Sequence, residues 1–244
     1  MTTKTKASKG GKRYRAAAEG MDSTKSYAPE EALDLLKQMS QTKFDETVEV
    51  HVSTNADPRH ADQLIRVVAI LPHGTGKPQR VLAFVQGAAV AAAREAGADY
   101  IADDEIIERI EKKGWVEFDV AVATQDQMSR IGKLGRVLGR RGLMPNPRTG
   151  TVVQPQDVGR AIREAKGGRI ELRMDKTANL HCSIGKVSFS TGDLLDNMAI
   201  VLDAVTKARP EGVKGQLVKA IYATTTMGPS ARLDMAQAMA LSVQ

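Results

Sequence analysis

Between residues 75 and 161, short apolar segments alternate with segments of helical periodicity. The apolar segments are VLAFVQ, DYIA and FDVAVA, and the helical ones are AAVAAAREAGA, DDEIIERIEKK and DQMSRIGKLGRVLG. Such alternation is typical of βαβ units, whose strands form a parallel sheet with helices on both faces. The middle of the chain therefore predicts an α/β domain with a doubly wound sheet over residues 75–161.

The segments on either side follow other patterns. Residues 29–39 carry apolar side chains at helical spacing, and TVEVHVST at 47–54 alternates like a half-exposed strand. A short helix is expected from Asp57 to about Ile65, before a strand at RVVAIL. Beyond the middle segment we expect a helix at DVGRAIREAKGG, a hairpin of RIELRM and ANLHCSIG, a helix at 192–208 and a strand at QLVKAIYATTTM.

Because similar elements flank a different middle, we predict an α+β domain of the split β-α-β type formed by both termini, over residues 26–74 and 162–244. The α/β domain is inserted into it. The chain would then cross between the domains near 71–76 and 157–163, which permits hinge motion. Residues 1–25 are polar and basic, and we expect them to form a flexible arm.

Positive charge is concentrated in two places along the chain. The net charge is +6, and residues 1–15 hold six basic side chains and no acid. Six more basic residues lie between Asp126 and Asp157, again without an acid. This distribution indicates a polyanionic partner, a nucleic acid or an anionic surface, although a modest excess of lysine also serves solubility alone.

Membrane and secreted classes are disfavoured. No apolar run reaches the length of a transmembrane helix, and the basic N-terminus lacks the apolar stretch of a secretory signal. The single cysteine, Cys182, cannot form an internal disulfide, which fits a reducing, cytoplasmic compartment.

Enzyme signatures are missing as well. A phosphate-binding loop would need glycine and Ser or Thr where the chain has Leu71 and Pro78, and no GxGxxG follows a first strand. The four histidines show no metal-ligand spacing, and Cys182 on a strand is more often a core residue than a nucleophile. We therefore expect no catalytic residue, no cofactor and no metal.

Three motifs are compatible with an RNA surface. In TKFDETVEV, Lys43 and Phe44 precede a strand and Thr47 lies on its polar face, so the ring could stack on a base; alternatively, Phe44 is simply a core residue. In TTTMGPS, the hydroxyls of Thr224, Thr225 and Thr226 precede Met227 and Gly228, and a polar strand end is the alternative reading. Weaker phosphate contacts are Lys176 at a hairpin turn and Gly185-Lys186 at a strand end.

These motifs together resemble the large-subunit ribosomal protein L-one family. The resemblance is carried by KRYRAAAEG, TKFDETVEVHV, DPRHADQ, LPHGTGK, AGADYIADDEIIERI, FDVAVAT, LGRRGLMPNPRTGTV, DKTANLH, IGKVSF, ARPEGVKG and TTTMGPS. It covers nearly the whole chain, from about residue 12 to residue 230.

The resemblance implies a fold and a function. The fold is a domain built from both termini with an inserted Rossmann-like domain, joined by a hinge. The function is to bind ribosomal RNA at the mobile stalk, through the three motifs above, and to assist movement and release of exit-site tRNA. Bacterial members also repress translation of their own mRNA by binding its leader. Arg59 and Arg66 are weaker candidates for a tRNA-facing side, and we expect a monomer off the ribosome.

The loop GRRGLMPNPRTGTV, residues 139–152, is expected to shape the interface between the domains. Pro145 and Pro147 would stiffen it, and Gly142 would allow a tight turn. Its arginines Arg140, Arg141 and Arg148 are available to RNA phosphate. Hinge candidates in the first crossing are Leu71, Pro72 and Gly74.

Two other functions remain open from the residues alone. A nucleotide-dependent enzyme would need the phosphate loop that is missing. A ribosome-free RNA-binding repressor or chaperone of the same fold would use the same surface as the ribosomal protein.

Overall fold

The computed structural model describes residues 11–22 and 24–242. The chain divides into two compact units, one made of the residues up to Gly76 and from Leu172 onwards, the other of Lys77–Glu171. We call them the discontinuous unit and the inserted unit. The expected content of mixed α and β structure with a parallel sheet is confirmed.

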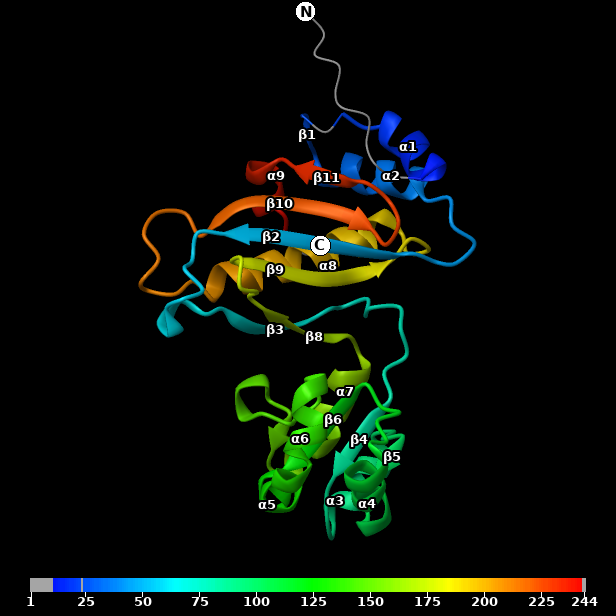
Figure 1. The fold of residues 1–244 in the computed structure, drawn as a ribbon, viewed down its shortest axis with the longest axis vertical. Helices are drawn as coiled ribbons and strands as arrows, with labels where there is room; N and C mark the ends of the chain where they lie inside the picture. Colours follow the sequence, from blue (N-terminus) through cyan, green and yellow to red (C-terminus); the bar gives the residue numbers. More distant parts are fainter. Residues whose placement is uncertain (1–10, 23, 243–244) are drawn as a thin grey trace, which may run out of the picture. The chain divides into compact units, whose positions relative to one another are not determined.

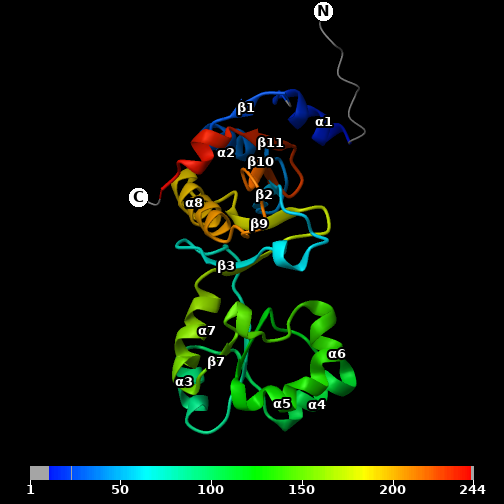
Figure 2. The ribbon, with the colours of Figure 1, turned by 90° about the vertical axis from the view of Figure 1, so that its left-hand side faces the viewer.

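The inserted unit is a three-layer α/β structure. Its sheet has the order β5-β4-β6-β7, and all neighbouring strands are parallel. The strands are β4 (Val81–Phe84), β5 (Tyr100–Ile101), β6 (Val120–Thr124) and β7 (Val152–Val153). The helices are α3 (Ala89–Glu95), α4 (Asp104–Lys113), α5 (Met128–Ile131), α6 (Gly135–Leu138) and α7 (Val158–Lys166). Figure 2 shows α3 and α7 on one side of β7, and α4, α5 and α6 on the other.

Both faces of this sheet are buried, which explains its continuous apolar strands. Val81, Ala83 and Val122 pack against α3 and α7. On the opposite face, Leu82 and Phe84 pack with residues of α4 and of the segment 128–138. Helix α4 begins after Asp103, whose carboxylate accepts from the Ile106 amide at 2.8 Å, and ends at Gly114 in the left-handed conformation.

The discontinuous unit contains a five-stranded sheet of order β1-β11-β10-β2-β9 (Figure 1). Its strands are β1 (Ser26–Tyr27), β2 (Thr47–Thr54), β9 (Asn179–Lys186), β10 (Val218–Thr225) and β11 (Ser230–Leu233). Strands β9 and β10 both run antiparallel to β2, so β9, α8 and β10 form a split β-α-β unit with β2 between its two strands. Helices α2 (Pro29–Met39) and α8 (Thr191–Lys207) pack against each other and against the sheet.

Alternating residues of β2 are buried against these helices. Val48, Val50 and Val52 have no exposed surface, whereas Glu49 and His51 remain partly exposed on the open face. Helix α8 begins with a capping box, in which Ser190 Oγ accepts from the Asp193 amide at 3.0 Å and Asp193 accepts from the Ser190 amide. Strands β3 (Arg66–Ile70) and β8 (Arg169–Arg173) form a separate two-stranded sheet. The hairpin expected from RIELRM and ANLHCSIG is therefore wrong, because β8 pairs with β3 and β9 pairs with β2.

Several predictions of local structure are wrong. Residues 12–19 of the expected arm form helix α1 (Lys12–Glu19), whose Ala17 is buried; residues 1–10 of that arm lie outside the described residues. The helix expected from Asp57 to Ile65 is only a 3₁₀ turn, Ala61–Gln63. Strands β1, β7 and β11 and helix α9 (Met235–Met239) were not predicted, because two- to five-residue elements leave little periodicity.

The second unit boundary also differs from the prediction. It lies between Glu171 and Leu172, ten residues after the expected position at 161/162. The reason is helix α7, whose buried side chains Ala161, Ile162 and Ala165 belong to the core of the parallel sheet. The alternation of strands and helices therefore continues one helix further than the sequence suggested.

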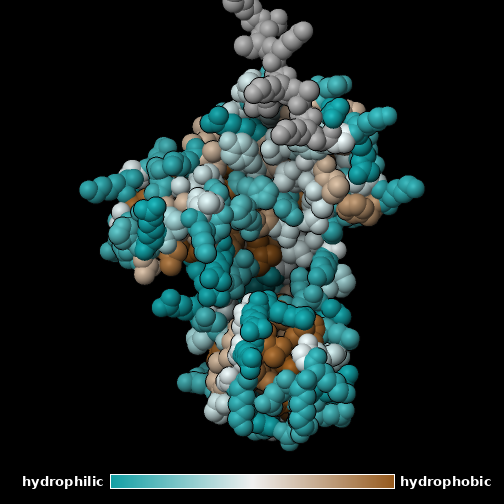
Figure 3. All heavy atoms as spheres, in the orientation of Figure 1, coloured by the Kyte–Doolittle hydropathy of each residue, from teal (hydrophilic) through white to brown (hydrophobic). Residues whose placement is uncertain are grey.

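The visible surface is largely hydrophilic (Figure 3). No helix in the described part of the chain has the length and apolar character needed to cross a membrane. The large apolar side chains that are exposed among the described residues are Tyr14, Phe44, Leu64, Ile70, Met227 and Met239.

Candidate RNA interface

One end of the five-stranded sheet brings together the start of β2 and the ends of β9 and β10. Thr47 pairs with Lys186, and Val48 pairs with Thr225. Lys43 and Phe44 directly precede β2, and Met227 and Gly228 directly follow β10. The structure therefore gathers most of the predicted RNA-binding residues at this end, although they are far apart in the sequence.

Two large apolar side chains are exposed here. Phe44 is 54% exposed and Met227 is 50% exposed, and the neighbouring Lys43 is exposed as well. The alternative that Phe44 is a core residue is therefore wrong. An exposed ring and thioether beside a cation can stack on bases while the cation meets phosphate.

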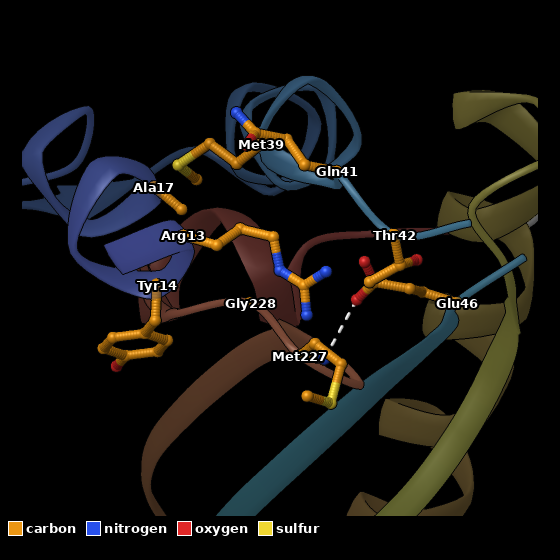
Figure 4. A pocket seen from close by; sticks show the side chains of 9 residues that line it. All are labelled: Arg13, Tyr14, Ala17, Met39, Gln41, Thr42, Glu46, Met227 and Gly228. Carbon is orange, nitrogen blue, oxygen red and sulfur yellow. Dashed lines mark hydrogen bonds between the residues drawn. The ribbon is translucent and has the colours of Figure 1, made fainter. Parts of the chain in front are cut away.

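A buried carboxylate fixes the turn that carries Met227. Glu46 is 1% exposed, and it accepts a hydrogen bond from the Met227 amide at 2.9 Å (Figure 4). It also accepts from Ser40 Oγ at 2.7 Å. Burial raises the pKa of Glu46, but the hydrogen bonds from the Met227 amide and from Ser40 outweigh it and hold the pKa below its ordinary value. Glu46 is therefore ionised at neutral pH. Its role is not visible in the sequence, because its partner Met227 is 181 residues away.

The threonines of the motif serve the fold more than the surface. Thr226 Oγ1 accepts from the Thr47 amide at 3.0 Å, and the Thr226 amide donates to the Thr47 carbonyl at 3.1 Å. Thr224 Oγ1 donates to the Pro229 carbonyl at 3.2 Å. Thr225 is buried, and a methyl group at Gly228 would overlap its Oγ1. These contacts tie the turn to the start of β2.

Lys186 places a cation at the same end of the sheet. Its Nζ donates to Thr47 Oγ1 at 2.8 Å, and the side chain stays partly exposed. Next to it, Asp45 accepts from Ser188 Oγ at 2.7 Å, which joins the segment before β2 to the segment after β9. The ammonium group is thus oriented but still open to an anion.

Helix α1 adds residues of the segment that was expected to be a flexible arm. A small pocket is lined by Arg13 and Tyr14 of α1, by Met39 and Thr42, and by Glu46, Met227 and Gly228. Figure 4 shows the Arg13 side chain extending from α1 toward Met227 and Glu46. The signal in the sequence was KRYRAAAEG, whose alanines favour a helix.

Three predicted contacts need correction. Gly185 and Thr225 are buried, so neither offers a surface to RNA; Gly185 has a φ of 155° and lies against Leu194 and Phe189. Lys176 is exposed, but it lies in the turn before β9, beyond the paired residues Ser53 and Asn179. It is thus at the opposite end of β2, which is about 23 Å long.

Arg59 and Arg66 also belong to that opposite end. Both are exposed, and they follow the end of β2. The Arg59 amide donates to Asp57 Oδ1 at 2.9 Å, which shapes the turn. Arg59 and Arg66 therefore belong to a different part of the discontinuous unit from Phe44 and Met227.

The first crossing of the chain is anchored to α8. Leu71 is buried, Pro72 is exposed, and Gly74 has a φ of 67°. Asn197, which is fully buried, accepts from the His73 amide at 3.2 Å and donates to the Gly74 carbonyl at 3.0 Å. In the sequence, Asn197 looks like an ordinary polar position of an amphipathic helix, so its role could not be predicted.

The loop expected to shape the domain interface lies within the inserted unit. Gly142, Pro145 and Pro147 are not at either crossing of the chain. Asn146 organises the loop, because its side chain accepts from the Arg148 amide at 2.9 Å and its backbone amide donates to Thr151 Oγ1 at 2.8 Å. That the loop shapes a domain interface stays a prediction.

The described part of the chain offers no site for a metal ion and no reactive thiol. No group of three or more His, Cys, Asp or Glu side chains there could hold a metal ion. Burial raises the pKa of the Cys182 thiol to about 12, so the thiolate is rare at neutral pH.

Comparisons with known proteins identify the family. Residues 36–229 match the model of the "Ribosomal protein L1p/L10e family". The chain is 52% identical to the "Large ribosomal subunit protein uL1" of Chloroflexus aggregans over 227 residues, covering 93% of this chain and 96% of that protein. It is 51% identical to the uL1 protein of Thermomicrobium roseum and 52% identical to that of Dehalococcoides mccartyi, with 93% and 92% of this chain and 95% and 94% of those proteins covered. The chain belongs to the ribosomal protein L1p/L10e family.

Proposed function

We propose that this protein binds large-subunit ribosomal RNA at the stalk through the end of the sheet that carries Phe44, Met227, Lys43 and Lys186. The observation that carries the proposal is the pair of half-exposed apolar side chains, Phe44 and Met227, beside two cations. The Met227 turn is held by buried Glu46, so the surface is rigid before RNA arrives. Preorganisation of this kind reduces the cost of binding.

The family indicates the assembly in which this surface works. The relatives are named as large ribosomal subunit proteins, and the protein is accordingly a structural component of that subunit in the cytoplasm. Proteins of this family are structural rather than enzymatic, which agrees with the expectation of a non-catalytic chain.

We further propose the finer roles that the resemblance implies. The protein assists movement and release of exit-site tRNA, with Arg59 and Arg66 on the tRNA-facing side, and represses its own mRNA by binding a leader that mimics the ribosomal site. It is a monomer off the ribosome. The two units are domains joined by a hinge, and the crossing fixed by Asn197 up to Gly74 supports a pivot after that residue.

Binding of the purified protein to the isolated stalk segment of ribosomal RNA tests the central proposal. Phe44→Ala is expected to weaken binding at least about fivefold, since it removes a stacking ring worth about 1–3 kcal/mol. Met227→Ala is expected to weaken binding as well, since it removes the exposed apolar side chain beside that ring. Leu64→Ala is the matched control, because Leu64 is 52% exposed but lies beyond the other end of β2. Equal affinities of all four proteins, with a steep salt dependence, would mean phosphate attraction only and would reject the proposal.

A further inference from the structure

A triplet of an apolar residue, glycine and a basic residue occurs three times in the inserted unit. The triplets are Ile131-Gly132-Lys133, Leu134-Gly135-Arg136 and Leu138-Gly139-Arg140. They lie in a helical stretch made of α5, a 3₁₀ turn at Gly132–Leu134, α6 and a 3₁₀ turn at Gly139–Arg141. The function proposed above does not use this stretch.

The triplets form three rows along the helical stretch. Each row repeats after three and then four residues, so its members lie above one another on one side. Ile131, Leu134 and Leu138 are fully buried in the core beneath the sheet. Each following residue is turned by about 100°, so the glycine row borders the buried row and the basic row faces the side opposite the core.

The glycines have no role inside the unit. Gly132, Gly135 and Gly139 have ordinary right-handed helical φ values of −51°, −54° and −63°. A Cβ atom at any of the three would meet nothing within 4 Å. Glycine is among the weakest helix formers, so alanine would serve the fold better at these positions. Their absence of side chains opens the helix backbone to close approach from outside.

The cations beside them lack internal partners. Lys133, Arg136 and Arg140 are exposed, and none of them forms an ion pair within the described part of the chain. Elsewhere in the unit some helical cations are paired: Lys112 of α4 pairs with Glu108 at 2.7 Å, and Arg160 of α7 pairs with Asp157 and Glu164. No acid occurs between Asp126 and Asp157.

The chemistry of the face selects a polyanion as its partner. None of the exposed large apolar side chains of the described residues lies between 128 and 141, so the face lacks the anchors of a protein interface. The apolar row is buried in the core, so it cannot insert into a membrane surface. Guanidinium groups match phosphate oxygens in two-point contacts.

We propose that the rows Gly132, Gly135, Gly139 and Lys133, Arg136, Arg140 form a second RNA-binding face, which takes a sugar–phosphate backbone against the bare helix. The choice of RNA as the polyanion rests on the proposed function. The basic row supplies charge, and the glycine row allows the backbone of the RNA to lie against the helix. This face lies on the inserted unit and is separate from the surface around Phe44 and Met227.

Two triple variants of the full chain test this face with a short RNA duplex of unrelated sequence as the probe. Lys133→Gln/Arg136→Gln/Arg140→Gln is expected to weaken binding at least about tenfold near 100 mM salt and to reduce the salt slope by about 2 to 3. The control is Arg94→Gln/Lys112→Gln/Lys113→Gln, which removes the same charge from α3 and α4. It should change the duplex affinity and the salt slope much less. Equal effects of the two charge variants would overturn the proposal.

Gly132→Ala/Gly135→Ala/Gly139→Ala separates binding from folding. We expect its Tm to rise while its duplex affinity falls at least about fivefold, because added methyl groups favour the helix but hold the RNA away. A lower Tm, or duplex binding as tight as in the wild type, would overturn the assignment of the glycine row. Equally tight binding of poly-glutamate, unaffected by the alanines, would mean attraction of any polyanion and would reject the RNA assignment.

Stalk RNA measured in parallel distinguishes this proposal from the one above. All three triple variants should bind the stalk segment within a few-fold of wild type, because Phe44 and Met227 are unchanged. If wild type fails to bind the stalk segment but the duplex results hold, the proposed function fails and the second face remains.

Discussion

At the scale of single residues, an anion buried below an RNA-binding surface requires explanation. Glu46 lies under the Met227 turn, where a negative charge would repel phosphate if it were exposed. Its hydrogen bonds to the Met227 amide and Ser40 direct the carboxylate inward. Its role is thus to fix the backbone that presents Met227.

Replacing Glu46 should therefore affect stability and RNA binding together. Glu46→Leu leaves the Met227 amide without its acceptor and is expected to lower the free energy of unfolding by about 1–3 kcal/mol. Glu46→Gln keeps one acceptor oxygen and should lose less of both stability and stalk-RNA affinity. Denaturant unfolding and RNA titration of the two variants check this, with Ser40→Ala as control for the second hydrogen bond. If Gln proves as damaging as Leu, the charge matters and the acceptor geometry does not.

Acid should weaken the same contact. The pKa of Glu46 is lowered in the folded state, so its contribution to stability is present above the unfolded pKa of about 4.3 and is lost as pH falls through the folded value. We expect the unfolding free energy of wild type to fall more steeply below about pH 4.3 than that of Glu46→Gln. Parallel curves for the two proteins would contradict this assignment.

Gly228 is a second residue of this turn at which a larger side chain does not fit. A methyl group there would overlap Thr225 Oγ1, which is buried. Gly228→Ala is expected to destabilise by about 1–3 kcal/mol, as overpacking does elsewhere. Adding Thr225→Ala removes the overlapping atom, so the double variant should be more stable than the sum of the single changes allows. Additive losses in denaturant unfolding would show that the two side chains do not interact.

At the scale of elements, a histidine pair links β2 to β9. His51 and His181 are register partners, and their Nδ1 atoms are 2.8 Å apart. One ring must therefore donate and the other accept. Burial and the nearby His181 lower the pKa of His51, which Glu49 opposes.

This pair predicts lower stability in mild acid. Since the folded pKa of His51 lies below its unfolded value of about 6.5, the unfolded chain binds more protons and stability falls as pH drops below that value. The slope is at most about 1.4 kcal/mol per pH unit for one group. In denaturant unfolding, His51→Gln should reduce the dependence of the free energy of unfolding on pH between about pH 6.5 and 5. An unchanged slope would mean that another group titrates there.

The sequence predicted those elements that bury a regular apolar face. The alternation in 47–54 and the helical spacing in 192–208 were sufficient for β2 and α8, and the run of strands and helices for the parallel sheet. Helix α1 escaped prediction because its lysine and arginine content suggested a solvated arm, and only Ala17 is buried. In the candidate interface, Phe44 and Met227 could be predicted from their own motifs. Glu46, Asn197 and Arg13 could not, because their roles depend on partners brought near only by folding.

At the scale of the whole molecule, all the residues proposed to bind stalk RNA belong to the discontinuous unit. Replacing Lys77–Glu171 by a short Gly/Ser linker should therefore leave stalk-RNA affinity within a few-fold of wild type. The same protein should lose the duplex binding assigned to the second RNA-binding face of the inserted unit. RNA titration of the shortened protein checks both statements, and circular dichroism checks that it is folded. A folded protein without stalk affinity would show that the inserted unit contributes to that site.

The position of β2 between β9 and β10 has a consequence for synthesis of the chain. On the ribosome, β2 leaves the exit tunnel long before either of its neighbours, since β9 begins at Asn179 and β10 ends at Thr225. The inserted unit, including helix α7 of its core, is complete at Glu171, so that unit can fold before β9 is made and while both edges of β2 are still unpaired. Glu49 and His51 alternate with the valines of β2. These polar side chains reduce the risk that the unpaired strand associates with another nascent chain.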